Sequence, residues 1–284
     1  MYRKSEFIIE KILFFSAVAA IFIVLLISFF IFYEGLPIFS KYGLNDFLLG
    51  HHWYPEDNVF GIFPMIVGTF YVTLGALVLG VPLGLGCAIF LAEFAPKKMA
   101  RFVRPGIELL AGIPSVVYGF WGMMVIVPWV RDYLGGPGFS ILTGSIILAV
   151  MILPTIINIS EDSIRAVPHE YKEGSLAIGA NHWQTIKKIM LPSAKSGIIA
   201  SIVLGMGRAI GETMAIIMVV GNVSAMPESI LDPVRTLTAN VALEMGYAAG
   251  DHSQALFATG IILFITIMFI NLLVNIIPGG VKKD

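Results

Sequence analysis

Residues 161–197 read EDSIRAVPHEYKEGSLAIGANHWQTIKKIMLPSAKSG, a polar segment that lies between two apolar stretches of the chain. Its first part ends at Pro168, and a proline is well suited to start a helix. Apolar residues then recur among polar ones at roughly helical spacing, namely Tyr171, Leu176, Ile178, Trp183, Ile186 and Ile189. The segment is too long for a simple helix connection, so we predict that it forms two short amphipathic helices.

A glycine and an asparagine predict where the first of these helices ends and the second begins. Gly179 can adopt the left-handed conformation that ends a helix, and Asn181 can cap the next one. Lys187 and Lys188 then fall in the later turns of the second helix, where cations favour the helix dipole. The apolar side of such a pair needs a cover, and the two candidates are the lipid surface and a soluble partner.

The composition of the chain excludes a water-facing surface. Of its 284 residues, 57% are hydrophobic and only 13% are charged. A bilayer core of about 30 Å needs about 20 mostly apolar helical residues, because lipid offers backbone amides no hydrogen-bond partner. We therefore predict an all-α membrane protein with six transmembrane helices, in the stretches 12–33, 62–92, 109–130, 139–160, 198–220 and 254–277.

The basic residues predict the orientation of these spans. Of the 18 lysines and arginines, 14 lie before the first stretch, after the second, after the fourth or at the C-terminus. The positive-inside rule places all these segments, including both termini and the loop 161–197, in the cytoplasm.

The fifth stretch contains an arginine and a glutamate, which are costly in a membrane unless they have partners. Arg208 and Glu212 are four residues apart, and a continuous helix puts them on one face, one turn apart. One interpretation is a static ion pair that fixes helix packing. The other is that Arg208 lies on an anion path, because a guanidinium suits phosphate oxygens, and that Glu212 balances it when the path is empty.

Three further features bear on such a path. Glu108, which begins the third stretch, is a weaker candidate for a position along it. The segments Gly112-Ile-Pro-Ser and 205–211 favour bent inner helices, because glycine and proline permit bends. The segment 226–251 is predicted to hold a short helix over the mouth of the path.

The sequence contains no recognisable catalytic or metal-binding motif. There is no G-x-x-x-x-G-K-[ST] motif to cradle nucleotide phosphates, and no nucleophile with its base. His51 and His52 have no third ligand nearby, and the single cysteine, Cys87, excludes a disulfide framework. We predict that the chain is not an enzyme and binds neither a metal nor a cofactor itself.

The loop also carries a recognisable signature. Glu173, Gly179, Ile189, Leu191 and Pro192 stand at the spacing E-x5-G-x9-I-x-L-P, which resembles the permease subunits of bacterial ATP-binding-cassette importers. In that family the loop forms the coupling helix, which docks into a groove on the ATPase subunit. The family pattern has two alanines after the glutamate, where this chain has Gly174 and Ser175, and both replacements are small.

Residues outside the loop narrow the resemblance to phosphate importer permeases. The segments 60–69, 108–119, 153–168 and 207–215 are similar to the PstC family. The sister PstA family has alanine-proline after Gly-Glu-Thr, whereas this chain continues with Met214 and Ala215. The resemblance implies the type I importer permease fold, with an N-terminal helix and outer loop (1–63), a permease domain (64–278, coupling loop 161–197) and a cytoplasmic tail (279–284).

The resemblance also implies a function and a set of partners. The chain would be a phosphate permease in the inner or plasma membrane of a prokaryote. It would pair with a PstA-like permease, two copies of a PstB-like ATPase that use ATP and magnesium, and an extracytoplasmic PstS-like binding protein. The alternatives are a permease for molybdate, sulfate or phosphonate, or a subunit of a secondary transporter or channel.

Overall fold

The structure, a computed structural model, describes residues 2–276 and is almost entirely helical. The predicted tail 279–284 lies outside the described residues. The α-helices are α1 (Tyr2–Tyr42), α2 (Leu44–Leu49), α3 (Phe63–Ile89), α4 (Lys97–Gly112), α5 (Ser115–Trp121), α6 (Val127–Tyr133), α7 (Ile141–Arg165), α8 (His169–Ala177), α9 (His182–Thr185), α10 (Leu191–Ser193), α11 (Lys195–Gly211), α12 (Met214–Val219), α13 (Leu237–Glu244) and α14 (Asp251–Ile276). The remaining elements are a two-stranded antiparallel hairpin (β1, Trp53–Tyr54; β2, Val59–Phe60), one 3-10 turn (η1, Pro55–Asp57) and three π-helical turns (η2, Phe90–Phe94; η3, Gly122–Ile126; η4, Ile186–Met190).

The apolar stretches form membrane-length helices. Four helices of the described chain are long and apolar enough to cross a membrane, or six spans result if each of two bent helix pairs counts as one. The four are α1, α3 with η2, α7 and α14. The first bent pair joins α4 to the segment 115–133, and the second joins the segment 182–193 to α11. The predicted all-α membrane fold is confirmed, and the number of spans depends on how the bent pairs are counted.

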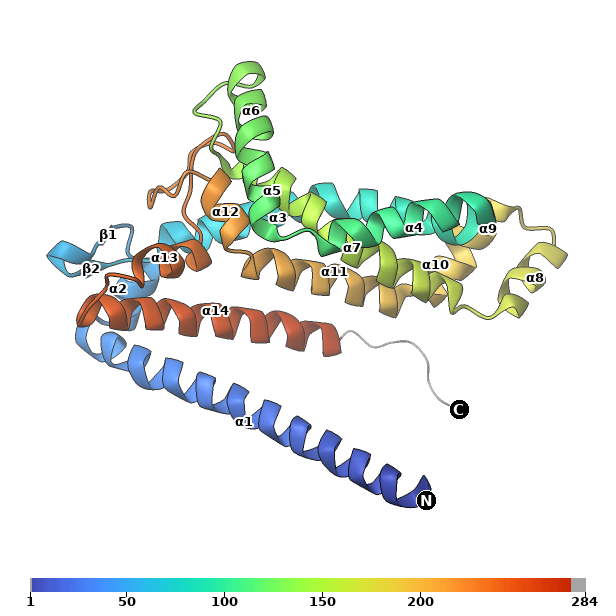
Figure 1. Cartoon of the computed structure of the whole chain (residues 1–284). Helices are drawn as coiled ribbons and strands as arrows, with labels where there is room; N and C mark the ends of the chain where they lie inside the picture. The colour runs from blue at the N-terminus through green and yellow to red at the C-terminus, as the bar shows by residue number, and fades with distance from the viewer. Residues whose placement is uncertain (1, 277–284) are drawn as a thin grey trace.

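The third predicted stretch is bent sharply where glycine and proline occur. α4 ends at Gly112, and the next helical segment leaves at 94° after Ile113 and Pro114. Proline has no backbone N–H and pushes the residue before it out of the helical region, so Ile113 is extended. The bend predicted from Gly112-Ile-Pro-Ser is confirmed. α6 consequently projects away from the long helices, whereas α5 stays packed beside α12 and α7 (Figure 1).

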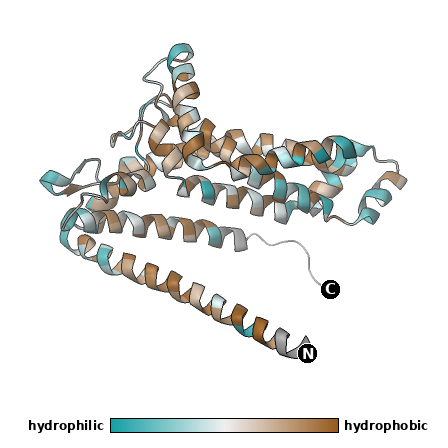
Figure 2. Ribbon diagram, in the orientation of Figure 1, coloured by the Kyte–Doolittle hydropathy of each residue, from teal (hydrophilic) through white to brown (hydrophobic). Residues whose placement is uncertain are grey.

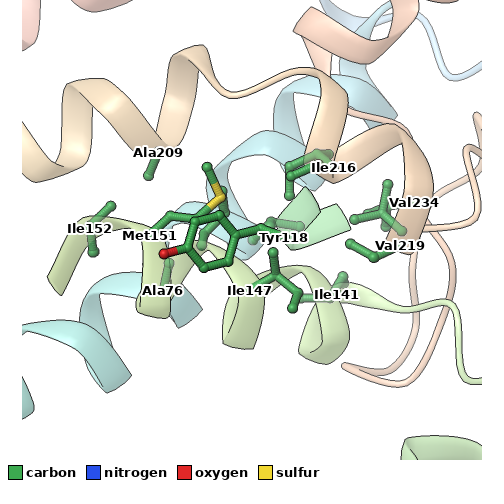
Figure 3. Close-up of a cluster of buried hydrophobic side chains, with 14 of the residues drawn as sticks. Ala76, Tyr118, Ile141, Ile147, Met151, Ile152, Ala209, Ile216, Val219 and Val234 are labelled. Atoms are coloured by element: carbon green, nitrogen blue, oxygen red, sulfur yellow. The ribbon is translucent and has the colours of Figure 1, made fainter. Parts of the chain in front are cut away.

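A close-packed group of α3, α7, α11, α5 and α12 forms the core. Figure 1 shows α3, α7 and α11 running alongside one another. Gly84 of α3 allows this approach, because a Cβ at that position would lie 2.8 Å from the Ile156 side chain of α7. The buried cluster at their centre contains Tyr118, Ile147, Met151, Ala209 and Ile216 (Figure 3).

α1 and α14 form a second layer. Their aromatic rings meet edge to face, with the Phe30 and Phe257 centroids 5.5 Å apart. The apolar side chains from Phe7 to Phe30 of α1 are exposed, as lipid-facing side chains are, whereas Ile38 near the end of the helix is buried. Figure 2 shows hydrophobic residues along α1 and hydrophilic residues gathered around β1, β2 and α8, at the two ends of the bundle. We call the end that carries α8 and α9 the loop end, and the end that carries the hairpin and α13 the hairpin end.

Candidate functional site

The loop helices form where the sequence predicts them. Pro168 precedes α8, and Gly179 follows it with a φ of +89°. Asn181 then begins α9 with a capping box, because its side chain accepts from the Gln184 backbone N–H while the Gln184 side chain accepts from the Asn181 N–H. The π-turn η4 and α10 continue the second helix, so the predicted pair hinged near Gly179 is confirmed.

The loop is shorter than its predicted bounds of 161–197. α7 runs through Arg165, and α11 begins at Lys195, which leaves 166–194 for the loop. The polar residues after Ser160 stay helical because Glu161, 4% exposed, is paired rather than solvated. Its Oε1 accepts from Arg104 of α4 and from Nε of Arg165 at 2.8 Å. Residues 161–165 of the predicted loop are therefore the last residues of α7.

The signature residues divide into three groups in space. Gly174, Ser175, Ile189 and Pro192 line one shallow groove of about 560 Å³ between α8 and the η4–α10 segment, and Glu173 is exposed on α8 beside it. Gly179 lies at the hinge. Leu191 packs against the buried cluster of Ile164, Val167 and Ile186 under the loop.

Of the two departures from the family pattern, only Ser175 has a structural explanation. A Cβ added to Gly174 would meet no atom within 4 Å, so nothing in the chain requires a glycine there. Ser175 is buried, and its hydroxyl shares a 3.0 Å hydrogen bond with the Thr185 hydroxyl of α9. An alanine would fill the same place on α8, but only the serine links the two loop helices.

Part of the apolar side of the loop stays uncovered. Ile186 is completely buried against the bundle, which the helical spacing alone did not distinguish from the other apolar residues. The loop's exposed patch consists of Tyr171, Leu176, Ile178 and Trp183, of which Ile178 is 88% exposed. An apolar patch of this kind outside the membrane-length helices marks a surface that meets another molecule.

One buried carboxylate ties both loop helices to the membrane helices. Glu93 lies in η2, which continues α3, and its side chain is 6% exposed. Its Oε2 accepts from Lys172 Nζ of α8 at 2.6 Å and lies 3.2 Å from His182 Nε2 of α9. Glu93 therefore links both loop helices to the end of α3.

Arg208 lies in the last turn of α11 and is exposed. No ion pair or hydrogen bond joins it to any residue that the structure describes. Its surroundings are open and apolar, because Leu204 and Met214 are more than half exposed and a Cβ at Gly207 or Gly211 would meet no atom. The helix end offsets part of the cost of this charge, since cations favour the C-terminal end of a helix.

Glu212 does not share a helix face with Arg208. α11 ends at Gly211, and Glu212 is extended, with φ −69° and ψ 131°. Its Oε1 accepts from the Ala215 N–H at the start of α12, and its backbone oxygen accepts from the Thr238 hydroxyl of α13. The expected one-turn spacing and ion pair are wrong, because the continuous helix predicted over 198–220 breaks at Glu212 and Thr213.

Glu108 is exposed near the end of α4. The prediction that it begins a helix is wrong, because α4 starts eleven positions earlier, at Lys97. It lines a pocket with basic residues of α4 and α7 at the loop end.

A polar cluster at the hairpin end was missed by the sequence analysis. The predicted short helix in 226–251 is present as α13, and its Glu244 is 6% exposed. Glu244 accepts from Arg235 Nη1 at 2.5 Å and from Trp53 Nε1 at 2.8 Å, and it lies 2.8 Å from His252 Nε2. The acidic residue in an otherwise apolar helix was the available signal. No group of three or more His, Cys, Asp and Glu residues that could hold a metal occurs in the part of the chain that the structure describes.

The fold and loop are those of a membrane component of a transport system. The family model "Binding-protein-dependent transport system inner membrane component" matches residues 80–283, and the chain belongs to this family. This is a family of transport components, and not of catalytic enzymes.

Named relatives place the chain more narrowly. It is 40% identical over 263 residues to the "Probable ABC transporter permease protein YqgH" of Bacillus subtilis, covering 90% of this chain and 85% of that one. It is 36% identical over 247 residues to the "Phosphate transport system permease protein PstC" of Pasteurella multocida, covering 80% and 77%. A chain of the MetNI methionine ABC transporter in "inward facing conformations" has the same fold, with a TM-score of 0.62 and 19% identity over 79% of this chain and 96% of that one.

Proposed function

We propose that this chain is the permease subunit of an ATP-driven importer of inorganic phosphate. The relatives named PstC support the substrate, and the match to a binding-protein-dependent family supports delivery by an extracytoplasmic, PstS-like protein. The chain pairs with a PstA-like permease and with two copies of a PstB-like ATPase. ATP and magnesium bind to those ATPases, and this chain contributes no nucleotide site.

The observation that carries the proposal is the unpaired charge of Arg208. An exposed guanidinium without an acidic partner, among the residues the structure describes, is free to receive an anion. Its planar fork of donors matches the oxygens of hydrogen phosphate. The break after Gly211 directs the Glu212 carboxylate to the start of α12, so it does not form an ion pair with Arg208. The exposed face of α11 is where the sister permease would complete the path.

The loop couples this path to the ATPase. In this mechanism the exposed patch of Tyr171, Leu176, Ile178 and Trp183 enters the groove of an ATPase subunit. Closure of the ATPases on nucleotide moves α8 and α9, and Glu93 carries the movement to α3 through Lys172 and His182. The path then alternates between outward and inward access.

The loop end faces the cytoplasm in this proposal. The positive-inside pattern supports that orientation, and Lys97, Arg101 and Arg104 at the start of α4 lie at the same end as the loop. Both termini are then cytoplasmic, and the Glu244 cluster at the hairpin end faces the binding protein.

ATP-driven uptake by the reconstituted complex tests the substrate and the role of Arg208 together. Phosphate uptake should exceed uptake of molybdate, sulfate and phosphonate, each tested as a competitor. Arg208→Gln should abolish uptake without reducing the amount of folded protein. Arg131→Gln is the matched control, because it removes an arginine that is paired at the surface with Asp132. Uptake that persists in Arg208→Gln at normal protein levels refutes the path.

A second experiment tests the coupling loop. The chain should co-purify with the ATPase, and changes at Glu173 or Gly179 should abolish that co-purification. Uptake that proceeds without any ATPase would refute the proposal as a whole.

A further inference from the structure

A second charged site lies on α4, away from Arg208. A pocket of about 600 Å³ opens at the loop end between α4, the segment 92–95 and the end of α7. No residue of α11 lines it. Its charged lining consists of four basic side chains and one acidic one, namely Lys97, Arg101, Arg104, Arg165 and Glu108.

The helical period of α4 gathers these charges on one stripe. Lys97, Arg101, Arg104 and Glu108 follow one another at intervals of three or four residues, which aligns them along one helix face. The adjacent face of α4 buries Ala100 and Ile107 against Leu91 and Ile157. This packing holds the stripe against the bundle, beside η2 and Arg165.

The pocket has more positive charge than its own carboxylates can balance. Buried Glu161 takes hydrogen bonds from Arg104 and Arg165, whose side chains remain 42% and 43% exposed. Each of these two guanidiniums uses Nε and Nη2 for protein acceptors, and Nη1 has no acceptor among the described residues. Lys97 and Arg101 also have no ion-pair partner in the described part of the chain.

We propose that this pocket binds a phosphoryl group, from the headgroup of an anionic phospholipid or from inorganic phosphate. Four cations against Glu161 and Glu108 leave a net excess of two positive charges, which suits a phosphate ester or hydrogen phosphate. The unused Nη1 donors of Arg104 and Arg165 supply directed hydrogen bonds to its oxygens. Phe102, 85% exposed on the same helix, is placed to enter the acyl region beside a bound headgroup.

Two probes distinguish the two sources of this group. Native mass spectrometry of the full-length chain measures retention of phosphatidylglycerol against phosphatidylcholine. Equilibrium dialysis of the chain in phosphatidylcholine nanodiscs measures binding of radiolabelled inorganic phosphate. Neither measurement needs ATP, a partner subunit or transport, so their outcome is independent of the proposed function.

The variant Lys97→Gln with Arg101→Gln removes two pocket charges and leaves the Glu161 cluster intact. Its matched control is Lys98→Gln with Lys195→Gln, which removes two exposed charges that do not line the pocket. Exposed charge contacts are individually weak, so loss of two of them should make the pocket variant bind about tenfold more weakly. The control should bind as the unchanged chain does.

The outcomes assign or overturn the site. If the pocket variant loses only phosphatidylglycerol binding, the ligand is a lipid headgroup. If it loses only phosphate binding, the ligand is the free anion. Loss of both supports a site that recognises the phosphoryl group from either source. No binding of either probe by the unchanged chain, or an equal loss in the control, overturns the proposal. If the double variant yields no folded protein, Arg101→Gln and Arg101→Lys replace it, and the lysine should retain more binding than the glutamine.

Discussion

Replacing Glu93 by glutamine removes the one charge that holds both loop helices. The Glu93 carboxylate is buried at the end of α3, and it meets Lys172 of α8 and His182 of α9. A glutamine has nearly the same shape, so the packing around η2 should survive. The expected result is a loop that opens more often and couples ATP hydrolysis to uptake less efficiently.

The expected destabilisation of the loop follows from how exposed the side chains of Glu93, Lys172 and His182 are. Removing one member of a fully buried ion pair costs about 3–5 kcal/mol, whereas an exposed pair contributes about 1 kcal/mol or less. Glu93 is 6% exposed, but Lys172 and His182 are 28% and 40% exposed and can turn toward water. The loop should therefore be destabilised by about 1–2 kcal/mol, which is a factor of about 5–30 in its opening equilibrium.

Two measurements check this prediction. Hydrogen exchange of the full-length chain should be faster in residues 169–190 and unchanged in α14. In the reconstituted complex, phosphate taken up per ATP hydrolysed should fall. Asp162→Asn is the matched control, because Asp162 is an exposed residue of α7 and its side chain has no partner among the described residues.

The charge reversal Glu93→Lys with Lys172→Glu separates coupling from a general loss of folding. It restores an ion pair between α3 and α8, and it should recover part of the lost protection and of the coupling ratio. Exchange in Glu93→Gln that matches the Asp162→Asn control would refute the link. A reversal that recovers nothing would also count against it.

Three further predictions concern single positions. Gly174→Ala should leave the loop intact or stabilise α8 by up to about 1 kcal/mol. Gly179→Ala should destabilise the loop by about 1 kcal/mol, because Gly179 has a positive φ. Hydrogen exchange of the loop measures both effects. Glu244→Gln should lower the free energy of unfolding by about 3 kcal/mol, measured by thermal melting, because it removes the charge opposite Arg235 and replaces one of the two acceptor oxygens by an NH2 donor. Gly84→Val should reduce the yield of folded protein by overpacking α3 against α7. Gly86→Val is the control and should not reduce the yield, because a Cβ added at Gly86 meets no atom within 4 Å.

Helix ends and bends that depend only on neighbouring residues could be predicted well from the sequence. Pro168, Gly179 and Asn181 mark the ends of α8 and α9 because their backbone preferences and hydrogen bonds involve only neighbouring residues. The bend after Gly112 has the same kind of cause in Pro114. Residues 161–165 lie within the predicted loop but continue α7, and the partners of Glu161 there are set by tertiary structure.

The candidate site was predicted less completely, because it also depends on contacts between residues that are far apart in the sequence. Spacing placed Arg208 and Glu212 on one face only on the assumption of an unbroken helix. The break after Gly211 is accompanied by contacts of Glu212 with α12 and α13, and the Thr238 contact spans 26 residues. Arg208 remains the candidate for the anion path, but as an unpaired charge rather than one half of an ion pair.

A helical membrane protein with a hinged, amphipathic loop can be predicted from local sequence features, because apolar content, helix caps and glycine conformation act over a few residues. Which polar residues are joined depends instead on the packing of the helices. Glu93 meets Lys172 and His182 across 79 and 89 residues, and Glu161 meets Arg104 across 57. Such contacts depend on how the helices pack side by side, and no periodicity within one segment contains that information.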